Sequence, residues 1–267
     1  MDSSVTFVGT ATTLLRLGGF TVLTDPNFLH RGQWSYFGQG LFSRRRTEPA
    51  IQPGDLPPLT AVLLSHLHGD HFDRVARREL DRDLPLVTTE HAARKLSRAG
   101  FRSTAALSTW DTHEFTDGAA TLRVTAVPAR HTAGPLNLLL PEVMGSVLEY
   151  RATAAAEPLR IYVSGDTVYH DDLASIRDRF PTLDLALLHL GGTRVLGVLL
   201  SMDDEQGVDL LELLGPTAAV PIHYDDYGLF HSPVSNFLEA VARRRPAADV
   251  HFLKRGDTLP LTVPARP

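Results

Sequence analysis

The feature that most constrains the fold of this chain is a short histidine-rich motif, Ser65-His66-Leu67-His68-Gly69-Asp70-His71. Three histidines and one aspartate fall within six residues, directly after the apolar residues 61–64. Such a set of imidazole and carboxylate groups suits a divalent ion such as Zn²⁺, Mn²⁺ or Fe²⁺. The alternative is a polar loop that holds several histidines by chance. We expect the motif to lie at the end of a buried strand and to form part of a metal site.

Other candidate ligands are placed in the same way, just after apolar runs that are typical of strands. They are His131, Asp166, His189 and His223. Side chains on different strands can meet only if those strands end at one edge of the sheets, where rigid strands hold the ligands in place. The sequence therefore predicts one polar site at such an edge.

The order of the expected elements favours an α/β (α+β) fold. The first part of the chain is rich in strands and the later part alternates strand and helix, which fits two sheets packed face to face with helices outside. Strands are expected near residues 5–8, 13–17, 20–24, 60–65, 84–88, 104–109, 112–116, 120–127, 136–140, 145–151, 159–163, 183–188, 218–222, 249–253 and 257–262, and helices near 73–80, 90–99, 171–180, 203–214 and 233–244.

Residues 26–58 differ from the rest, because they hold glycines, prolines and aromatic residues without a clear period. We expect a long loop, either a functional lid or a flexible surface insertion. The run Arg44-Arg45-Arg46 within it could bind a phosphate or carboxylate, or could be a solvated part of the loop.

Composition narrows the class of protein. Of the 267 residues, 43% are hydrophobic and 21% are charged, which is ordinary for a globular protein. The net charge of −5 argues against nucleic acid as a partner. The chain has no cysteine, no signal-peptide pattern at its start and no apolar run of membrane-spanning length. We expect a cytoplasmic protein with a single domain over residues 1–267.

The ligand pattern as a whole resembles the dinuclear metallo-hydrolases of the metallo-β-lactamase superfamily. The matching positions follow one another in the family's order along the chain: Asp25, His66, His68, Asp70, His71, His131, Asp166 after Ser164-Gly165, and His223. The resemblance implies a four-layer αββα sandwich with the site at one edge between the sheets.

The resemblance also implies roles for the ligands. His66, His68 and His131 would bind a first metal, Asp70, His71 and His223 a second, and Asp166 would bridge both. Zn²⁺ is the first expectation for the two divalent ions, with Mn²⁺ or Fe²⁺ as alternatives. The implied reaction is hydrolysis of an ester, lactone or phosphodiester by attack of a metal-bound hydroxide, with Asp70 orienting the water. The alternatives are a non-catalytic metal or ligand sensor and a di-iron redox enzyme.

Within the superfamily the chain is similar to two groups. Residues 221–224, Pro-Ile-His-Tyr, resemble L-ascorbate-6-phosphate lactonases, and Asp25-Pro26 with the arginine run and Pro57-Pro58 resembles N-acyl phosphatidylethanolamine phospholipase D. Both groups act on phosphate-bearing molecules, so the resemblance implies a small-molecule substrate with phosphate. Antibiotic hydrolysis is not expected. The second metal of true metallo-β-lactamases commonly has a thiolate ligand, and this chain has no cysteine to supply one.

Four further residues are candidates at the predicted site. His189 and His231 could act as catalytic acids or could be structural, and His189 stands where relatives often have proline. Tyr224 and Arg194 could contact the substrate. A homo-oligomer is left open.

Overall fold

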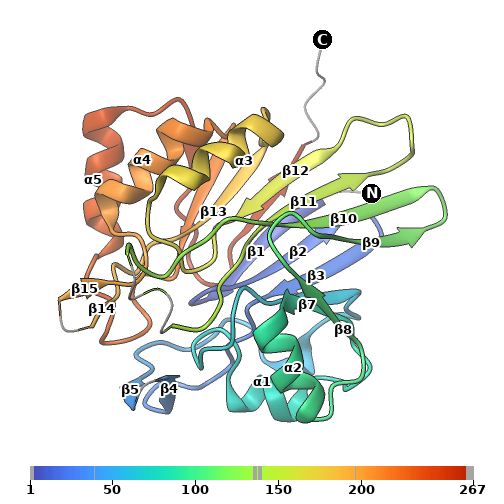
Figure 1. Cartoon of the computed structure of the whole chain (residues 1–267), viewed down its shortest axis with the longest axis horizontal. Helices are drawn as coiled ribbons and strands as arrows, with labels where there is room; N and C mark the ends of the chain where they lie inside the picture. The colour runs from blue at the N-terminus through green and yellow to red at the C-terminus, as the bar shows by residue number, and fades with distance from the viewer. Residues whose placement is uncertain (1–2, 39, 135–136, 138–139, 196, 263–267) are drawn as a thin grey trace.

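The structure, a computed structural model, describes residues 3–38, 40–134, 137, 140–195 and 197–262, and two seven-stranded sheets pack face to face in it (Figure 1). The strands of the first sheet are, in spatial order, β18 (Thr258–Leu261), β1 (Ser3–Gly9), β2 (Thr12–Leu17), β3 (Phe20–Thr24), β6 (Ala61–Leu63), β7 (Leu86–Thr89) and β8 (Thr104–Leu107). The strands of the second sheet are β17 (Asp249–Val250), β16 (Ala218–Ile222), β13 (Leu185–His189), β12 (Leu159–Val163), β11 (Gly145–Arg151), β10 (Ala120–Val127) and β9 (Thr112–Asp117).

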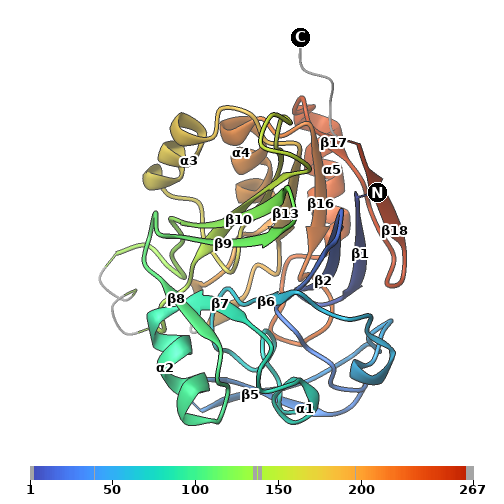
Figure 2. The ribbon, with the colours of Figure 1, turned by 90° about the vertical axis from the view of Figure 1, so that its right-hand side faces the viewer.

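Helices cover the outer face of each sheet, as Figure 2 shows. The first sheet carries α1 (Arg74–Glu79) and α2 (Glu90–Arg98), and the second carries α3 (Ala174–Arg179), α4 (Asp204–Leu214) and α5 (Val234–Arg244). Single turns of 3-10 helix lie at Pro53–Asp55 and Asp171–Leu173. The four-layer αββα sandwich is thereby confirmed.

Three apolar clusters hold these layers together. The central one lies between the sheets and includes Phe7 and Leu15 of the first sheet and Leu148 and Ile161 of the second. The two outer clusters pack α1 and α2 on the first sheet, and α3, α4 and α5 on the second. Both sheets are therefore buried on both faces, which explains the nearly continuous apolar runs of their central strands.

The strand directions bring the candidate ligands together. β3 and β6 run parallel in the first sheet, and β12, β13 and β16 run parallel in the second. β10 has the direction of β12, because both are antiparallel to β11. Parallel strands end at the same edge, so the residues that follow them meet there.

The prediction of a long loop over residues 26–58 is wrong in part. This stretch contains a β-hairpin of β4 (Trp34–Gly38) and β5 (Leu41–Arg44). A second small hairpin, β14 (Arg194–Val195) with β15 (Val198–Leu199), was also not expected. Most of the strand expected at 136–140 falls outside the described residues. The other expected helices and strands are present, with ends shifted by a few residues. Among the described residues, no helix has the length and apolar character to cross a membrane.

Candidate metal centre

The histidine-rich motif turns sharply after β6. The backbone N–H groups of His71 and Phe72 both donate to the carbonyl of His68, at 3.1 and 2.8 Å. Gly69 permits a close approach of β4: its N–H donates to the Tyr36 carbonyl at 2.9 Å, and a Cβ at this position would lie 2.5 Å from that same oxygen. Glycine in the motif is thus explained by packing against the hairpin.

The first cluster consists of His66, His68 and His131, whose ligand atoms lie within 4.8 Å of one another. His66 Nε2 is 2.9 Å from His68 Nδ1. The second nitrogen of two rings is held from outside the cluster, because His66 Nδ1 is 3.0 Å from Ser65 Oγ and His131 Nδ1 is 3.3 Å from the Leu200 carbonyl oxygen. Such outer contacts fix the orientation of a metal-binding ring.

The second cluster joins Asp70, His71, Asp166 and His223, all of them buried. His223 Nε2 is 3.1 Å from Asp70 Oδ2, and its Nδ1 is 3.5 Å from Asp166 Oδ1. His71 Nε2 is 3.3 Å from Asp166 Oδ2. His223 has a φ of 63°, and its N–H donates to the Thr10 carbonyl at 2.8 Å. A histidine in the left-handed region costs conformational energy, which is common where a functional side chain must be aimed.

The donor set fits divalent metal ions. Five buried atoms in the two clusters have no hydrogen-bond partner among the described residues: Asp70 Oδ1, His71 Nε2, His131 Nε2, Asp166 Oδ1 and His223 Nδ1. Buried polar atoms are rarely left without a partner, and these five atoms are available to bind ions. Imidazole nitrogens and carboxylate oxygens that converge from several strands match the ligand chemistry of Zn²⁺, Mn²⁺ or Fe²⁺.

The electrostatics of the first cluster and of Asp166 also suit metal binding. Burial and the neighbouring His131 lower the pKa of His68 to about 3, and burial also lowers the pKa of His66 and His131. These rings are therefore neutral, as metal ligands must be. Burial works to raise the pKa of Asp166, but His223 and His71 hold it well below its ordinary value, so this carboxylate is charged.

Asp25 lies beneath the second cluster and connects several of its parts. It accepts hydrogen bonds from Ser65 N at 2.7 Å and Ser65 Oγ at 2.9 Å, and its Oδ2 is 3.1 Å from His71 Nδ1. The same oxygen is 3.3 Å from His189 Nε2. Burial works to raise the pKa of Asp25, but His71 and His189 lower it to about 2.

The structure separates the remaining candidates from the ligand clusters to different degrees. His189 is fully buried, between Asp25 and Ser164, whose Oγ lies 3.1 Å from His189 Nδ1. Tyr224 is buried in the core between the sheets, beside Phe7.

The other two candidates are exposed. Arg194 pairs with Asp203 at 3.2 Å. The side chain of His231 has none of the contacts described for the clusters.

The arginines of the run at residues 44–46 differ in exposure and in contacts. Arg44 is exposed and lies 4.7 Å over the ring of Trp34. Arg45 is fully buried, with one amino group 3.4 Å from Asp226. The run is therefore neither a uniform solvated loop nor a uniform anion site.

Sequence reasoning missed several residues that support the ligands. Ser65 and Ser164 each precede a ligand or its glycine and contact a site histidine, and their position at a strand end was an available signal. Asn27 donates from Nδ2 to the Gly69 carbonyl at 2.9 Å. Nothing in the sequence pattern indicates that long-range contact.

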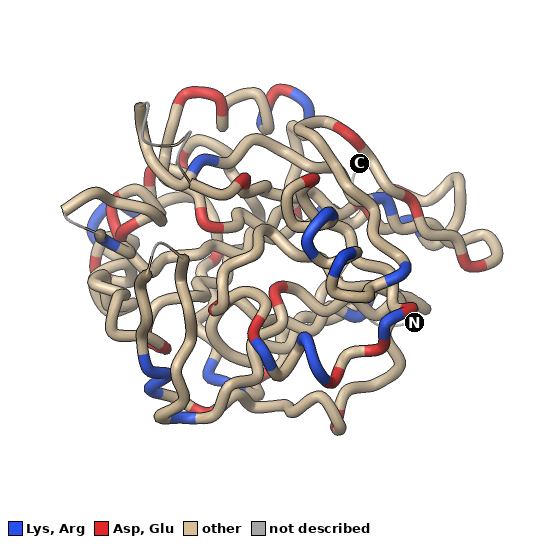
Figure 3. Tube along the Cα trace, turned by 60° about the horizontal axis from the view of Figure 1, so that its bottom comes forward, with Lys and Arg blue, Asp and Glu red and all other residues tan. Residues whose placement is uncertain are grey.

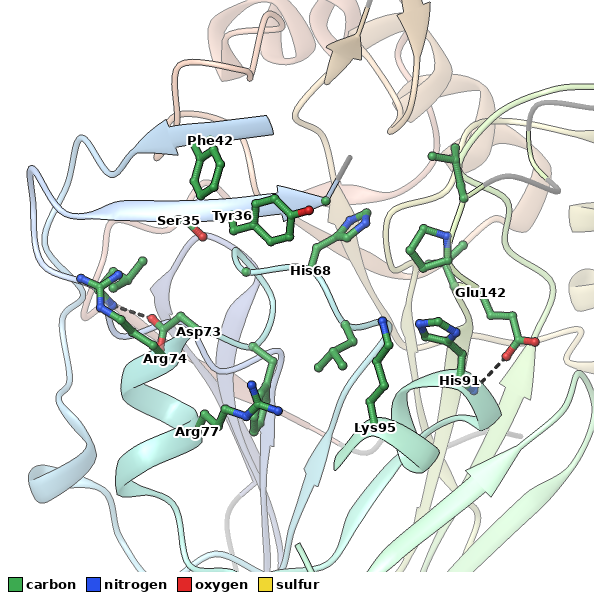
Figure 4. Close-up of a pocket in the computed structure, with 18 of the residues that line it drawn as sticks. Ser35, Tyr36, Phe42, His68, Asp73, Arg74, Arg77, His91, Lys95 and Glu142 are labelled. Atoms are coloured by element: carbon green, nitrogen blue, oxygen red, sulfur yellow. Dashed lines mark hydrogen bonds between the residues drawn. The ribbon is translucent and has the colours of Figure 1, made fainter. Parts of the chain in front are cut away.

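A cavity of about 1240 Å³ opens beside the first cluster, with His68 and Gly69 in its lining (Figure 4). Hairpin β4–β5 forms one wall of it, and α1 and α2 contribute to another. The cavity gives a small molecule access to His68, which is half-buried.

Comparison with known proteins agrees with this fold. Residues 21–224 match the β-lactamase superfamily domain. A UPF0173 metal-dependent hydrolase of Thermus thermophilus is 31% identical over 261 residues, which cover 96% of this chain and 98% of the relative. Among solved structures, an isothiocyanate hydrolase from Delia radicum gut bacteria is similar with a TM-score of 0.81 and 22% identity, covering 96% of this chain and 98% of that one. A "possible metal-dependent hydrolase" from Veillonella parvula has a TM-score of 0.80 and 20% identity, covering 97% and 99%. These two structures share the fold of this chain.

Proposed function

The chain belongs to the metallo-β-lactamase superfamily of metal-dependent hydrolases, and from this premise we propose that it hydrolyses an ester, lactone or phosphodiester bond at a site for two divalent ions. The observation that supports the proposal most directly is the set of buried ligand atoms without partners. They belong to both clusters, so both clusters call for an ion.

Seven side chains would hold the ions. His66, His68 and His131 form one site, Asp70, His71 and His223 the other, and Asp166, which contacts His71 and His223, would serve both. Zn²⁺ is the first candidate, with Mn²⁺ or Fe²⁺ as alternatives. Two bound divalent ions activate a water molecule and stabilise the charge that develops on the reacting oxygen.

The chain's own residues orient and support this chemistry. Asp70 offers Oδ1, which has no hydrogen-bond partner in the described part of the chain, to orient the attacking water and accept its proton. His189 faces Asp25 and Ser164, so we assign it to holding Asp25, which in turn orients His71. This is the structural role that the sequence left open for His189. A catalytic role for His231 stays a prediction from the sequence, because the side chain is exposed and belongs neither to a ligand cluster nor to the cavity lining.

The substrate is proposed as a small molecule, and a phosphate-bearing one is the expectation carried over from the two resembling groups. The isothiocyanate hydrolase that shares the fold acts on a different bond, so the fold leaves the bond type open. A sensor without turnover and a di-iron redox enzyme are the alternative outcomes of the test below. A cytoplasmic location and the absence of a nucleic-acid partner stay predictions from the sequence.

The test combines metal content with turnover. We expect the purified protein to hold about two metal ions per chain by elemental analysis, and to hydrolyse members of a panel of p-nitrophenyl phosphodiesters, p-nitrophenyl acetate and dihydrocoumarin. Asp166→Asn and His68→Ala should each lower bound metal and abolish hydrolysis, because each removes a ligand. His251→Gln changes a histidine that pairs with Asp249 and belongs to neither ligand cluster, so it should leave both readouts unchanged.

Three results would contradict the proposal. Full hydrolysis by a metal-free preparation would remove the metal from the reaction. A metal-loaded protein that hydrolyses nothing on the panel but binds a panel compound would indicate a sensor. A metal centre that changes oxidation state during turnover would indicate redox chemistry.

A further inference from the structure

The cavity beside His68 has two walls of opposite chemical character. One is the aromatic face of hairpin β4–β5, and the other is a basic face made by α1 and α2. Figure 4 shows Tyr36 and His68 side by side, with Lys95 extending from α2 towards them and Arg77 on α1 nearby. The proposed function does not require an aromatic wall and a basic wall, so a separate role accounts for them.

The aromatic wall consists of Trp34, Tyr36 and Phe42, which are 51, 50 and 59% exposed. Among the described residues, only one other large apolar side chain is comparably exposed, so these side chains are concentrated on one hairpin. The rings of Tyr36 and Phe42 lie 4.8 Å apart and form a continuous surface. A cluster of exposed aromatic rings that lines a cavity is typical of a site for an apolar or aromatic group.

The hairpin is fixed in place against the metal-binding motif. Besides the contact of Gly69 with Tyr36, the Arg74 guanidinium donates to the Trp34 carbonyl at 2.6 Å. A Cβ added to Gly38 would lie 3.4 Å from His68 Nε2, so the end of β4 lies directly beside this ligand. A group bound on the aromatic wall would therefore lie next to the metal centre.

The basic wall has cations that the protein itself leaves unpaired. Arg77 and Lys95 line the cavity and form no ion pair with any described residue. By contrast, Arg78 and Arg94 on the same two helices pair with acidic neighbours. Figure 3 turns the lower end of Figure 1, where α1 and α2 lie, towards the viewer and marks Lys and Arg positions in blue among Asp and Glu positions in red.

The two acidic residues in the lining accept hydrogen bonds from backbone N–H groups. The Asp73 carboxylate is buried and accepts backbone N–H bonds at the start of α1, and Glu142 accepts from the His91 N–H at the start of α2. The three cations in the lining, Arg74, Arg77 and Lys95, therefore outnumber its two carboxylates, of which only that of Glu142 is exposed.

We propose that this cavity binds an amphipathic anion, a small molecule with an aromatic or apolar group and a separate carboxylate, phosphate or sulfonate. The apolar group lies on Trp34, Tyr36 and Phe42, the anion pairs with Arg77 and Lys95, and the part between them reaches His68. Guanidinium and ammonium groups both bind such anions, and the aromatic faces supply burial for the rest. This inference rests on the proposed function only in naming the bound molecule as its substrate.

Two fluorescent probes of similar shape test the inference without any turnover. 8-Anilinonaphthalene-1-sulfonate carries the anion, and N-phenyl-1-naphthylamine has the same ring system without it. In Arg77→Gln/Lys95→Gln the sulfonate should bind about tenfold more weakly, while the neutral probe changes by less than about twofold. In Trp34→Ser/Phe42→Ser both probes should bind at least about fivefold more weakly, because the aromatic surface is lost.

The matched control is Arg78→Gln/Arg98→Gln, which removes the same charge from the same two helices outside the cavity lining. It should leave both affinities unchanged, and cooperative urea unfolding of each variant shows that the probes report on folded protein. Equal sulfonate binding by the control and the Arg77/Lys95 variant would overturn the inference. So would sulfonate binding that is lost in Asp166→Asn and retained in Arg77→Gln/Lys95→Gln, because the anion would then lie at the metals.

The outcome is separable from that of the proposed function. Probe binding with the expected variant pattern and no hydrolysis of any substrate would uphold the cavity and reject the reaction. Hydrolysis combined with probe binding that is unchanged in the variants of both walls would uphold the reaction and reject the cavity.

Discussion

At the residue scale, Asp25 connects strand ends of the two sheets beneath the ligand clusters. It follows β3 of the first sheet, holds Ser65 after β6, and contacts His189 at the end of β13 in the second sheet. Its φ of 36° lies in the left-handed region, which is costly for an aspartate without a fixed role. Asp25 thus orients His71 without being a ligand in the proposed site.

Asp25→Asn is therefore expected to weaken metal binding while the fold persists. An amide keeps the size of the carboxylate but has one acceptor oxygen and no charge, so it cannot serve Ser65, His71 and His189 together. Loss of such an outer contact typically lowers metal affinity roughly 10- to 100-fold. Competition with a chromophoric chelator measures the affinity. Asp55→Asn, on the exposed 3-10 turn, is the control, and equal affinities for the two variants would contradict the role given to Asp25.

The sequence predicted the ligands but not the residues that hold them, for a physical reason. A metal ligand after an apolar strand is a local pattern, because strand, turn and ligand are adjacent in the chain. The contact of Ser164 with His189 or of Asn27 with Gly69 joins residues 25 and 42 positions apart, and serine and asparagine are common in any loop. The roles expected for Tyr224 and Arg194 depended in the same way on side-chain direction, which spacing alone does not determine.

At the scale of elements, the long strands were predictable and hairpin β4–β5 was not. Strand prediction relies on alternation of apolar and polar residues, with the apolar side chains buried. In β4 the alternation is interrupted, because the apolar residues Tyr36 and Phe37 are adjacent and Gly38 follows them. The exposed Trp34 and Tyr36, with Phe42 of β5, are the residues that line the cavity.

Asp73 connects the start of α1 to residues 28 and 29, which precede hairpin β4–β5. One carboxylate oxygen accepts from Phe28 N and Leu29 N at 2.5 and 2.7 Å, and the other accepts from Val75 N and Ala76 N, both at 2.8 Å. One side chain thus satisfies four backbone donors from two segments, more than a usual helix N-cap.

Asp73→Ala should therefore lower the free energy of unfolding by about 3 kcal/mol, since several buried N–H groups lose their acceptor. Thr89→Ala is the matched comparison, because Thr89 is the N-cap of α2 and accepts from Ala92 N alone. It should cost about 1 kcal/mol. Urea unfolding followed by circular dichroism measures both, and equal losses would show that Asp73 acts only as a cap.

At the scale of the whole molecule, a buried polar network beneath the site connects residues 27–45, here called the hairpin segment, to both sheets. The Arg45 guanidinium donates to the Asn27 carbonyl at 2.8 Å and to the Asn27 side chain, and lies 3.4 Å from Asp226. Asp226 follows β16 of the second sheet and accepts from Thr10 N, after β1 of the first sheet, at 3.0 Å. Through Asn27 the network also reaches Gly69 of the metal-binding motif.

This network predicts that the three consecutive arginines differ sharply in their effect on stability. Arg45→Met removes a buried guanidinium and leaves Asn27 and Asp226 with lost partners, so the free energy of unfolding should fall by about 3 kcal/mol. Arg255, 3.1 Å from Asp226, keeps part of the compensation for that carboxylate. Arg44→Met, at the exposed neighbour, should change stability by less than about 0.5 kcal/mol.

Arg45→Lys separates charge from geometry at the same position. An ammonium keeps the charge beside Asp226 but cannot donate in the two directions that the planar guanidinium does. The expected order of urea midpoints is therefore wild type, then Arg45→Lys, then Arg45→Met, with Arg44→Met beside the wild type. Because the same network supports Asn27 under Gly69, bound metal should fall in the same order. Stability of Arg45→Met equal to that of Arg44→Met would mean that the hairpin segment is held to the sheets by its apolar contacts alone.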